Sequence, residues 1–327
     1  MPNAPPPAGG AFVCSAPVRL ATIDLGTNTV RLLVADAEPG ATSWHVVDHH
    51  QRVTRLGEGS HASGRLGERP AARTTAAVVE YVARARRAGA ARVEIVATSA
   101  VREAQNGAEY ALALEQATGV RVRVISGEDE ARLTLRGILH ALGPGHGTIV
   151  AFDIGGGSTE FMLARDGALV ASQSLRLGVV RLAERYPLAE PDAAAEYRDL
   201  EQDVARHLAR ELMPSIAGAV VDRLVGSAGT VTTLAALDLG LAAYDAGRVQ
   251  GHVLTRAAIE RQRARLAALD VAGRAALPCL EPGRADLILP GIAIVMATLA
   301  CVGREQLTVS DWGLREGIMA DVLAGAI

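Results

Sequence analysis

Three glycine-rich turns carry residue types that could bind an anion. Residues 26–29 read Gly-Thr-Asn-Thr, residues 155–158 read Gly-Gly-Gly-Ser, and residues 226–230 read Gly-Ser-Ala-Gly-Thr. Glycine lets backbone N–H groups converge on a ligand, because no Cβ blocks close approach. One such turn could be a plain tight hairpin, but three turns flanked by hydroxyl groups predict several phosphate-binding loops around one cleft. The candidate phosphate-binding residues in these turns are Gly26, Thr27, Asn28, Thr29, Gly155, Gly156, Gly157, Ser158, Gly226, Ser227, Ala228, Gly229 and Thr230.

An aspartate precedes each of the first two turns, Asp24 and Asp153. A carboxylate beside a phosphate loop repels the ligand unless a cation lies between them. Mg²⁺ suits this position, because it takes one or two carboxylates, keeps several waters and accepts phosphate oxygens. The two residues therefore predict a magnesium site, with manganese as the alternative metal. The competing interpretation is that each aspartate only accepts hydrogen bonds from turn amides.

A run of acids and a separate arginine are further candidates for the chemistry. Residues 126–130 read Ser-Gly-Glu-Asp-Glu, and acids such as Glu128 and Asp129 could simply complement a helix dipole. Phosphoanhydride hydrolysis, however, needs a group that orients and deprotonates water, and a glutamate here could do so. Arg102 follows a predicted buried strand at residues 92–97 and could bind phosphate, or it could be a surface arginine at a helix start.

Two hairpins that hold these residues are related by an internal repeat. Residues 18–36 read as strand, glycine turn and strand, and residues 148–164 repeat the pattern. The aligned pairs are Asp24 with Asp153, Gly26 with Gly155, and Thr29 with Ser158. Each hairpin opens a run of mixed strands and helices, so the repeat predicts two related α/β domains that face each other.

The remaining elements follow from hydrophobic periodicity and from turn residues. The other predicted strands are residues 45–55, 92–97, 120–125, 222–225 and 307–310. The predicted helices are residues 70–88, 108–118, 191–217 and 314–324, one from about residue 129, and one that follows residue 230. The second half is thus expected to be mainly helical.

Composition limits the classes of protein to which the chain could belong. Its 327 residues are 49% hydrophobic and carry a net charge of −3, which argues against a general nucleic-acid binder. Residues 1–17 lack the features of a secretory signal and are expected to form a disordered tail. The apolar residues 287–302 are short for a membrane span and are interrupted by Pro290-Gly291, so they predict a buried helix. The three cysteines show no ligand spacing, which favours the cytoplasm.

Together these motifs resemble one family. The stretches that carry the resemblance are I-D-L-G-T-N-T-V-R-L, T-S-A-V-R-E-A-Q-N, I-S-G-E-D-E-A-R-L, F-D-I-G-G-G-S-T-E-F, G-S-A-G-T-V-T-T-L and V-S-D-W-G-L-R-E-G. In this order, from about Leu20 to the C-terminus, they are similar to the exopolyphosphatase and guanosine pentaphosphate phosphohydrolase (Ppx/GppA) family. The resemblance implies an α/β, two-domain, actin-like and sugar-kinase-like (ribonuclease H-like) fold with an interdomain cleft.

The resemblance also implies roles for individual residues. The family's catalytic glutamate is the second acid of S-G-x-E-E-A, which matches Glu130, while Asp129 replaces the first acid and is not expected to be essential. The metal-associated aspartate of D-I-G-G-G-S matches Asp153, and the acid of the same motif matches Glu160. The first loop reads G-T-N-T where the family usually has G-S-N-S, so both hydroxyl groups are kept.

The expected function is that of a magnesium-dependent exopolyphosphatase with Glu130 as general base. Release of the 5′ γ-phosphate of guanosine pentaphosphate (pppGpp) is the alternative, and a superfamily kinase or a non-catalytic sensor of phosphorylated ligands is a weaker one. Longer relatives carry a C-terminal helical domain, and the lack of a match to it favours short chains as substrate.

The domain boundaries and partners complete the expectations. Residues 18–135 are predicted to form the first domain, with a C-terminal helix at about 312–327 packing back onto it. Residues 136–311 are predicted to form the second domain. The expected partner is inorganic polyphosphate or pppGpp, not nucleic acid or a membrane, and a homodimer stays open.

Overall fold

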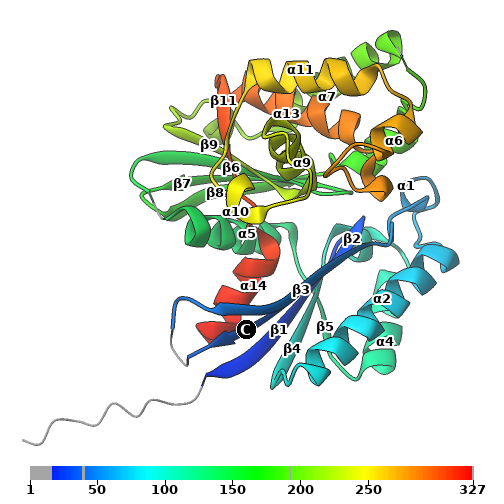
Figure 1. Ribbon diagram of the computed structural model, residues 1–327, viewed down its shortest axis with the longest axis vertical. Coiled ribbons are helices and arrows are strands. Elements are labelled where there is room, and N and C mark those ends of the chain that lie inside the picture. Colours follow the sequence, from blue (N-terminus) through cyan, green and yellow to red (C-terminus); the bar gives the residue numbers. More distant parts are fainter. Residues whose placement is uncertain (1–16, 39–40, 144, 192, 326–327) are drawn as a thin grey trace, which may run out of the picture.

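The computed structural model describes residues 17–38, 41–143, 145–191 and 193–325. It contains two β-sheets, one in each half of the molecule, with helices around them (Figure 1). Residues 1–16 of the predicted tail lie outside the described residues.

The first sheet has the strand order β3-β2-β1-β4-β5. Its strands are β1 (Val18–Leu25), β2 (Thr29–Ala37), β3 (His45–Val53), β4 (Arg92–Ala97) and β5 (Val122–Val124). The helices of this half are α1 (Ser60–Ser63), α2 (Glu68–Arg87), α3 (Ser99–Glu103) and α4 (Gly107–Thr118). The strands β3, β2 and β1 are antiparallel, whereas β4 and β5 run parallel to β1.

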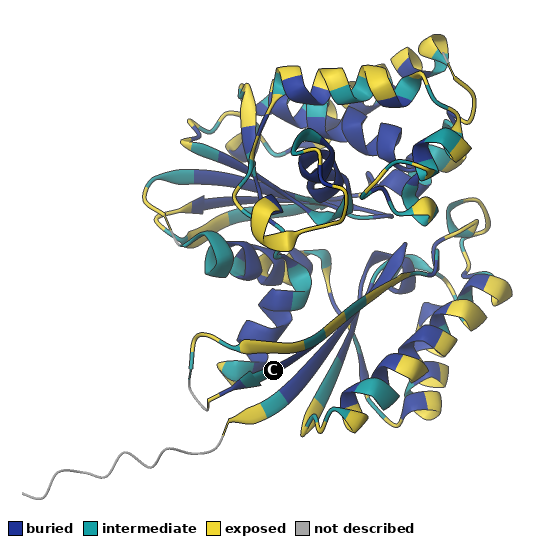
Figure 2. Cartoon of the chain, viewed as in Figure 1, coloured by how far each residue is buried: buried dark blue, intermediate teal, exposed yellow. Residues whose placement is uncertain are grey.

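Side chains alternate across this sheet and give it two buried faces. Ile23 and Leu32 belong to the core beneath α2 and α4. Their neighbours Leu20 and Leu33 belong instead to the core that contains the last helix, α14 (Leu314–Leu323). Figure 2 shows the central strands buried, the edge strand β3 largely exposed, and α2 and α4 exposed on their outer surfaces.

The second sheet has the strand order β10-β11-β9-β6-β7-β8. Its strands are β6 (Thr148–Ile154), β7 (Thr159–Arg165), β8 (Ala168–Leu175), β9 (Arg223–Ser227), β10 (Val253–Thr255) and β11 (Gln306–Val309). The helices around it are α6 (Val179–Arg185), α7 (Ala194–Glu211), α8 (Pro214–Ala217), α9 (Ala228–Asp238), α10 (Ala246–Val249), α11 (Arg256–Ala267), α12 (Val271–Ala275), the 3₁₀ turn η1 (Pro282–Arg284) and α13 (Ile288–Val302).

The two sheets repeat one topology. In the second sheet β8, β7 and β6 are antiparallel, and β9 and β11 follow in parallel, as β4 and β5 do in the first. Both hairpin turns also close in the same way, because the N–H of Gly26 donates to the Thr29 carbonyl and that of Gly155 donates to the Ser158 carbonyl. The predicted repeat and the two-sheet α/β fold class are confirmed.

Helix α5 (Gly127–Leu142) connects the two halves. Leu133 packs in the core of the first sheet, while Leu135 and Ile138 pack against the second. α5 also crosses α14 closely, since a Cβ built on Gly317 would lie only 1.8 Å from the Leu133 carbonyl oxygen. The domain boundaries expected at residues 135 and 312 stay a prediction, although α14 does pack against β1 and β2.

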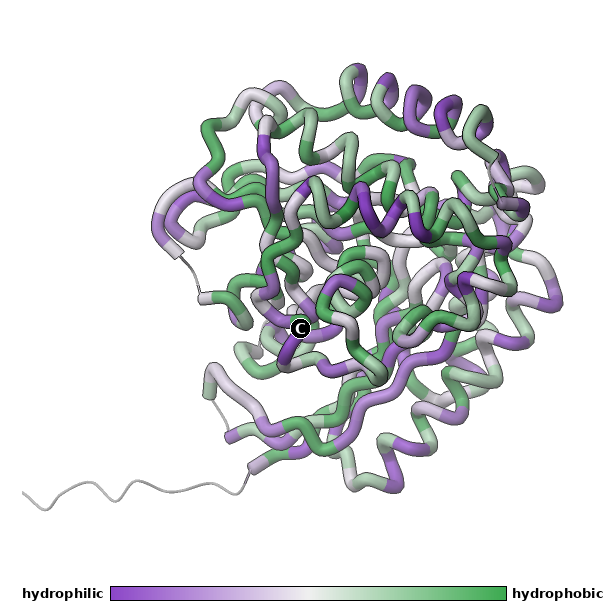
Figure 3. Tube along the Cα trace, turned by 45° about the horizontal axis from the view of Figure 1, so that its top comes forward, coloured by the Kyte–Doolittle hydropathy of each residue, from purple (hydrophilic) through white to green (hydrophobic). Residues whose placement is uncertain are grey.

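The outer helices are amphipathic, and α13 is not. In α7 the buried residues Tyr197, Leu200, Val204 and Leu208 recur at helical spacing, and Figure 3 shows the same alternation along the outer helices. Pro290 lies in the first turn of α13, where a missing N–H costs little, so Pro290-Gly291 does not interrupt the helix. In the part of the chain that the structure describes, no helix is both long and apolar enough to cross a membrane.

Candidate functional site

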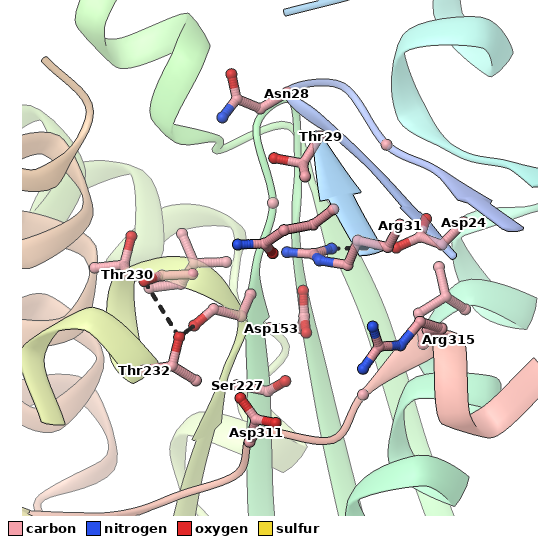
Figure 4. Close-up of a pocket in the computed structure, with 18 of the residues that line it drawn as sticks. Asp24, Asn28, Thr29, Arg31, Asp153, Ser227, Thr230, Thr232, Asp311 and Arg315 are labelled. Atoms are coloured by element: carbon pink, nitrogen blue, oxygen red, sulfur yellow. Dashed lines mark hydrogen bonds and ion pairs between the residues drawn. The ribbon is translucent and has the colours of Figure 1, made fainter. Parts of the chain in front are cut away.

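A cavity of about 1110 Å³ lies between the two sheets and is lined by all three glycine-rich turns. We call it the central cavity, and the turns at residues 26–29, 155–158 and 226–230 are loops 1, 2 and 3. The predicted site residues that line it are Asp24, Gly26, Thr27, Asn28, Thr29, Glu130, Asp153, Gly155, Gly156, Gly157, Ser158, Ser227, Ala228, Gly229 and Thr230. In Figure 4 the labelled side chains of both halves surround the same space.

Loops 1 and 2 face each other across the cavity at close range. A Cβ built on Gly156 would lie 2.9 Å from the Cβ of Thr27, and one built on Gly157 would lie 3.0 Å from Oγ1 of the same threonine. Only glycine therefore fits here without displacing the opposite loop. In loop 1 the buried Oδ1 of Asn28 has no hydrogen-bond partner among the described residues, and a cation or a water molecule in the cavity would supply one.

Loop 3 leads from β9 directly into α9, so the amino-terminal end of this helix faces the cavity. Ala228 has a φ of 71°, a left-handed conformation that is uncommon for a residue with a Cβ. Backbone N–H groups and the dipole at such a helix end attract anions. Gly226, which was also a candidate, does not line the cavity but packs in β9 against Phe152 and Val231.

Two carboxylates stand at the base of the cavity. Asp24 is 3% exposed and accepts a hydrogen bond of 3.1 Å from Arg31 on the neighbouring strand. Burial raises the pKa of Asp24 despite the opposing effect of Arg31. Burial also raises the pKa of Asp153, a shift that a hydrogen bond from Ser227 opposes. Burial thus disfavours the charge of both carboxylates, and a bound cation would stabilise their ionised forms.

These carboxylates fit a magnesium ion that keeps most of its waters, but not a fully protein-ligated metal. Among the described residues no group of three or more His, Cys, Asp or Glu side chains is arranged to hold a metal ion. Mg²⁺ commonly binds through one or two carboxylates together with phosphate oxygens and water. Asp24 and Asp153 supply that number.

Glu130 lies in the first turn of α5 and lines the central cavity. Its carboxylate is 7% exposed and forms an ion pair of 2.8 Å with Arg102. Ser126 caps the helix by accepting a hydrogen bond from the N–H of Asp129, which fixes the turn that presents Glu130. Burial, with the nearby Glu160 charge, raises the pKa of Glu130 well above its ordinary value. A buried carboxylate with a raised pKa is suited to accept a proton near neutral pH.

Arg102 and Glu160 lie behind this wall instead of lining the cavity. Arg102 donates to the Ile125 carbonyl as well as to Glu130. Glu160 is paired with Asp153 in the β6–β7 ladder and accepts a hydrogen bond of 2.7 Å from Ser174. Burial and the Asp153 charge raise the pKa of Glu160 to about 7. The structure therefore places both residues next to Glu130 and not among the loops.

Three arginines that the sequence analysis did not single out line the cavity, namely Arg31, Arg284 and Arg315. Arg284 extends over loop 3, where a Cβ on Gly229 would lie 2.2 Å from its guanidinium. Burial, with Arg31 nearby, lowers the pKa of Arg284 to about 10. Its nearest carboxylate is Glu281 at 3.2 Å, and an anionic ligand would further stabilise the buried charge. Arg31 and Arg315 lie in stretches that carry the family resemblance and could have been found from sequence, whereas no local signal marks Arg284.

Comparison with known proteins assigns the family. The model of the Ppx/GppA phosphatase family matches residues 33–325. The chain belongs to this family. It is 37% identical to "Exopolyphosphatase 2" of Mycobacterium tuberculosis over 316 residues, which cover 92% of this chain and 97% of that relative. It is 27% identical to "Guanosine-5'-triphosphate,3'-diphosphate pyrophosphatase" of Photobacterium profundum, with 93% of this chain and 59% of that relative covered.

The fold of this Ppx/GppA protein agrees with a solved structure of the family. The crystal structure of the Aquifex aeolicus family member superposes with a TM-score of 0.79 at 32% identity, covering 95% of this chain and 99% of that one. The chain is accordingly a phosphoanhydride hydrolase of the Ppx/GppA family, and the central cavity is its candidate active site.

Proposed function

We propose that this Ppx/GppA protein is an exopolyphosphatase that removes the terminal phosphate from inorganic polyphosphate. One observation carries the proposal: loops from both sheets and three arginines surround a single cavity, and the buried Glu130 that lines it is held by Arg102 from behind. Such a cavity is built for a strongly anionic ligand that has a hydrolysable end.

The loops and arginines bind and orient the chain end in this proposal. Backbone N–H groups of loops 2 and 3, with hydroxyls such as Ser158 and Thr230, donate to the phosphate oxygens. Arg284 lies over loop 3, and a bound anion would offset the burial that disfavours its charge. Positioning and charge stabilisation supply most of the catalysis in phosphoryl transfer, where the protein forms no covalent bond.

Glu130 acts as the general base in this reaction. It takes a proton from a water molecule as the water oxygen attacks the terminal phosphorus and the bond to the bridging oxygen breaks. The products are orthophosphate and a chain that is one phosphate shorter. Arg102 positions the carboxylate of Glu130 for this step through the 2.8 Å ion pair.

Asp24 and Asp153 would hold magnesium, or manganese, in the same proposal. When bound there, the ion would neutralise charge on the phosphate oxygens. Glu160 is omitted from this pair because its carboxylate accepts from Ser174 and does not line the cavity.

Short chains are the proposed substrates. The cationic side chains that line the cavity are three arginines, which can contact only a few phosphates at one time. Rates of phosphate release against chain length test this, and a strong preference for chains of hundreds of phosphates would contradict it.

Hydrolysis of pppGpp is the second candidate function. Trp44 and Trp312 line the cavity with their rings stacked 5.2 Å apart, and such surfaces suit a nucleobase. The experiment that separates the two functions measures phosphate release from polyphosphates of defined length and from pppGpp, with magnesium, alone and in competition. The proposal expects the larger kcat/KM for polyphosphate, and a larger value for pppGpp would replace it with the second candidate.

A further inference from the structure

A second pocket opens on the far side of Glu130 from the central cavity. We call it the side pocket; its volume is about 410 Å³. It is lined by Arg102, Glu103, Gly127, Ser174 and Arg176. None of these residues lines the central cavity, so the two spaces are separate.

Two hydrogen-bonded pairs form the wall between the spaces. Glu130 lines the central cavity, and its partner Arg102, at 2.8 Å, lines the side pocket. Beside them Ser99, which lines the central cavity, donates a hydrogen bond of 2.8 Å to Glu103, which lines the side pocket. The wall beside Glu130 is therefore one layer of polar side chains, not packed core.

The geometry of the reaction places the product orthophosphate at this wall, a placement that rests on the proposed function. In phosphoryl transfer the attacking water and the leaving chain lie on opposite sides of the phosphorus. Because Glu130 takes the proton from the water, the new orthophosphate lies between Glu130 and the remaining chain. A chain that stays bound would block the return path through the central cavity.

We propose that the side pocket is an exit site for orthophosphate, which leaves past Arg102 while the shortened chain stays in the central cavity. The site takes a small tetrahedral oxyanion. Its ligands would be the guanidinium groups of Arg102 and Arg176, which bind such oxygens in a fork.

Arg102 gates the passage in this scheme. Before cleavage its guanidinium is held by the negative charge of Glu130. When water attacks, one water proton passes to Glu130, the new P–O bond forms, and the bridging P–O bond breaks with its electrons on the leaving chain. Glu130 is then neutral and attracts Arg102 less, so the anionic product has only the Ile125 carbonyl to replace as partner of the guanidinium. Return of the proton to phosphate or solvent restores the pair.

At the mouth of the side pocket, phosphate can compete with a carboxylate for a second arginine. Arg176 is 70% exposed and pairs with Glu103 at 2.6 Å, and Arg181 pairs with the same carboxylate at 3.2 Å. An incoming phosphate replaces Glu103 as partner of Arg176, while Arg181 keeps Glu103 neutralised. The carboxylate thus sets how strongly the mouth holds phosphate.

The inhibition pattern of added orthophosphate tests the proposal. Initial rates of release from radiolabelled polyphosphate are measured at several chain concentrations and several concentrations of unlabelled orthophosphate, at fixed magnesium. If phosphate leaves first by its own site, it binds the enzyme that still holds chain, so it lowers kcat even at saturating polyphosphate. If inhibition vanishes at saturating polyphosphate, phosphate and chain share one path and the inference is overturned.

Two variants separate phosphate binding from a structural effect at the mouth. Arg176→Glu should raise the inhibition constant for orthophosphate by about tenfold, the value of one charge-assisted hydrogen bond. Glu103→Gln should lower it, because Arg176 is released to the phosphate. If both variants raise the inhibition constant for orthophosphate, the loss of the Arg176–Glu103 ion pair explains the change. That result would contradict the exit site.

A matched control and the basic assay complete the design. Arg210→Glu reverses the charge of an arginine that is 75% exposed and pairs only with Glu211 among the described residues, so it should leave the inhibition constant unchanged. If the wild-type protein releases no phosphate from polyphosphate, the proposed function fails and this inference with it. If it releases phosphate but is inhibited only competitively, the inference alone fails.

Discussion

Replacing Glu130 by glutamine removes the proposed base while it changes little else. Glutamine has the same length, and its side-chain oxygen can still accept the hydrogen bond from Arg102 that is 2.8 Å long in the wild type. What is lost is the negative charge and the ability to take a proton from water. Glu130→Gln should therefore reduce kcat by roughly 10²- to 10⁴-fold, or about 2.7–5.5 kcal/mol of barrier.

Polyphosphate binding should survive this substitution. The buried carboxylate of Glu130 repels a polyanion, so its neutral replacement should bind the chain as tightly as the wild type or more tightly. Turnover is measured as orthophosphate release with magnesium, and binding by calorimetry with the variant, whose slow turnover leaves the chain intact. Melting curves show whether Arg102, left without its charged partner, lowers stability.

The dependence of turnover on pH provides a second readout of the same residue. Burial raises the pKa of Glu130, so the wild-type kcat should rise with pH over a range well above the ordinary pKa of glutamate. The kcat of the variant should not rise with pH over that range. Glu128→Gln, an exposed neighbour in the same helical turn, is the matched control and should retain full activity. Turnover of Glu130→Gln within a few-fold of wild type would refute its role as base.

Three further perturbations test the surroundings of the site. In Gly178→Ala the new Cβ would lie 2.3 Å from the Gly156 carbonyl oxygen and would displace loop 2, so kcat/KM should fall roughly 10²-fold; unchanged kinetics would contradict the tight packing. Gly317→Ala should lower the free energy of unfolding by about 1–3 kcal/mol, because its Cβ would collide with α5; denaturant titration checks this, and wild-type stability would disprove the close crossing. For Glu160, whose pKa is about 7 when folded, the native state keeps a proton that the unfolded chain releases above about pH 4.5. Wild-type stability in EDTA should fall as pH rises from about 4.5 to 7, and Glu160→Gln should make that fall shallower by at most about 1.4 kcal/mol per pH unit, because other buried carboxyls also contribute to it; parallel pH profiles for both proteins would contradict it.

The hairpins and loops could be predicted because their signals are local. Gly26 and Gly155 stand at turns between apolar strands, and the repeat around Asp24 and Asp153 predicted two facing sheets. The family resemblance was enough to propose Glu130 as the catalytic base. Glu130 lines the cavity because α5 packs between both sheets.

What the sequence missed depends on contacts between distant segments. β8 and β10 were not predicted, because A-L-V-A-S-Q-S-L mixes small and polar residues and Val253–Thr255 is only three residues long. Arg284 reaches the cavity only through the packing of the second half, so no local pattern marks it. Arg315 lies in the quoted stretch V-S-D-W-G-L-R-E-G, but its place in the cavity depends on α14 packing back onto the first sheet. Arg102 follows its predicted strand as expected, but the position of α5 places it behind Glu130.

A crystal of the protein soaked with sulfate tests the central claim most directly, because sulfate has the shape and charge of a terminal phosphate. The account predicts a sulfate ion in the central cavity, bound by amides of loops 2 and 3 and by Arg284, with the Glu130 carboxylate facing it. Sulfate bound only outside this cavity, or a Glu130 side chain turned away from it, would contradict the account.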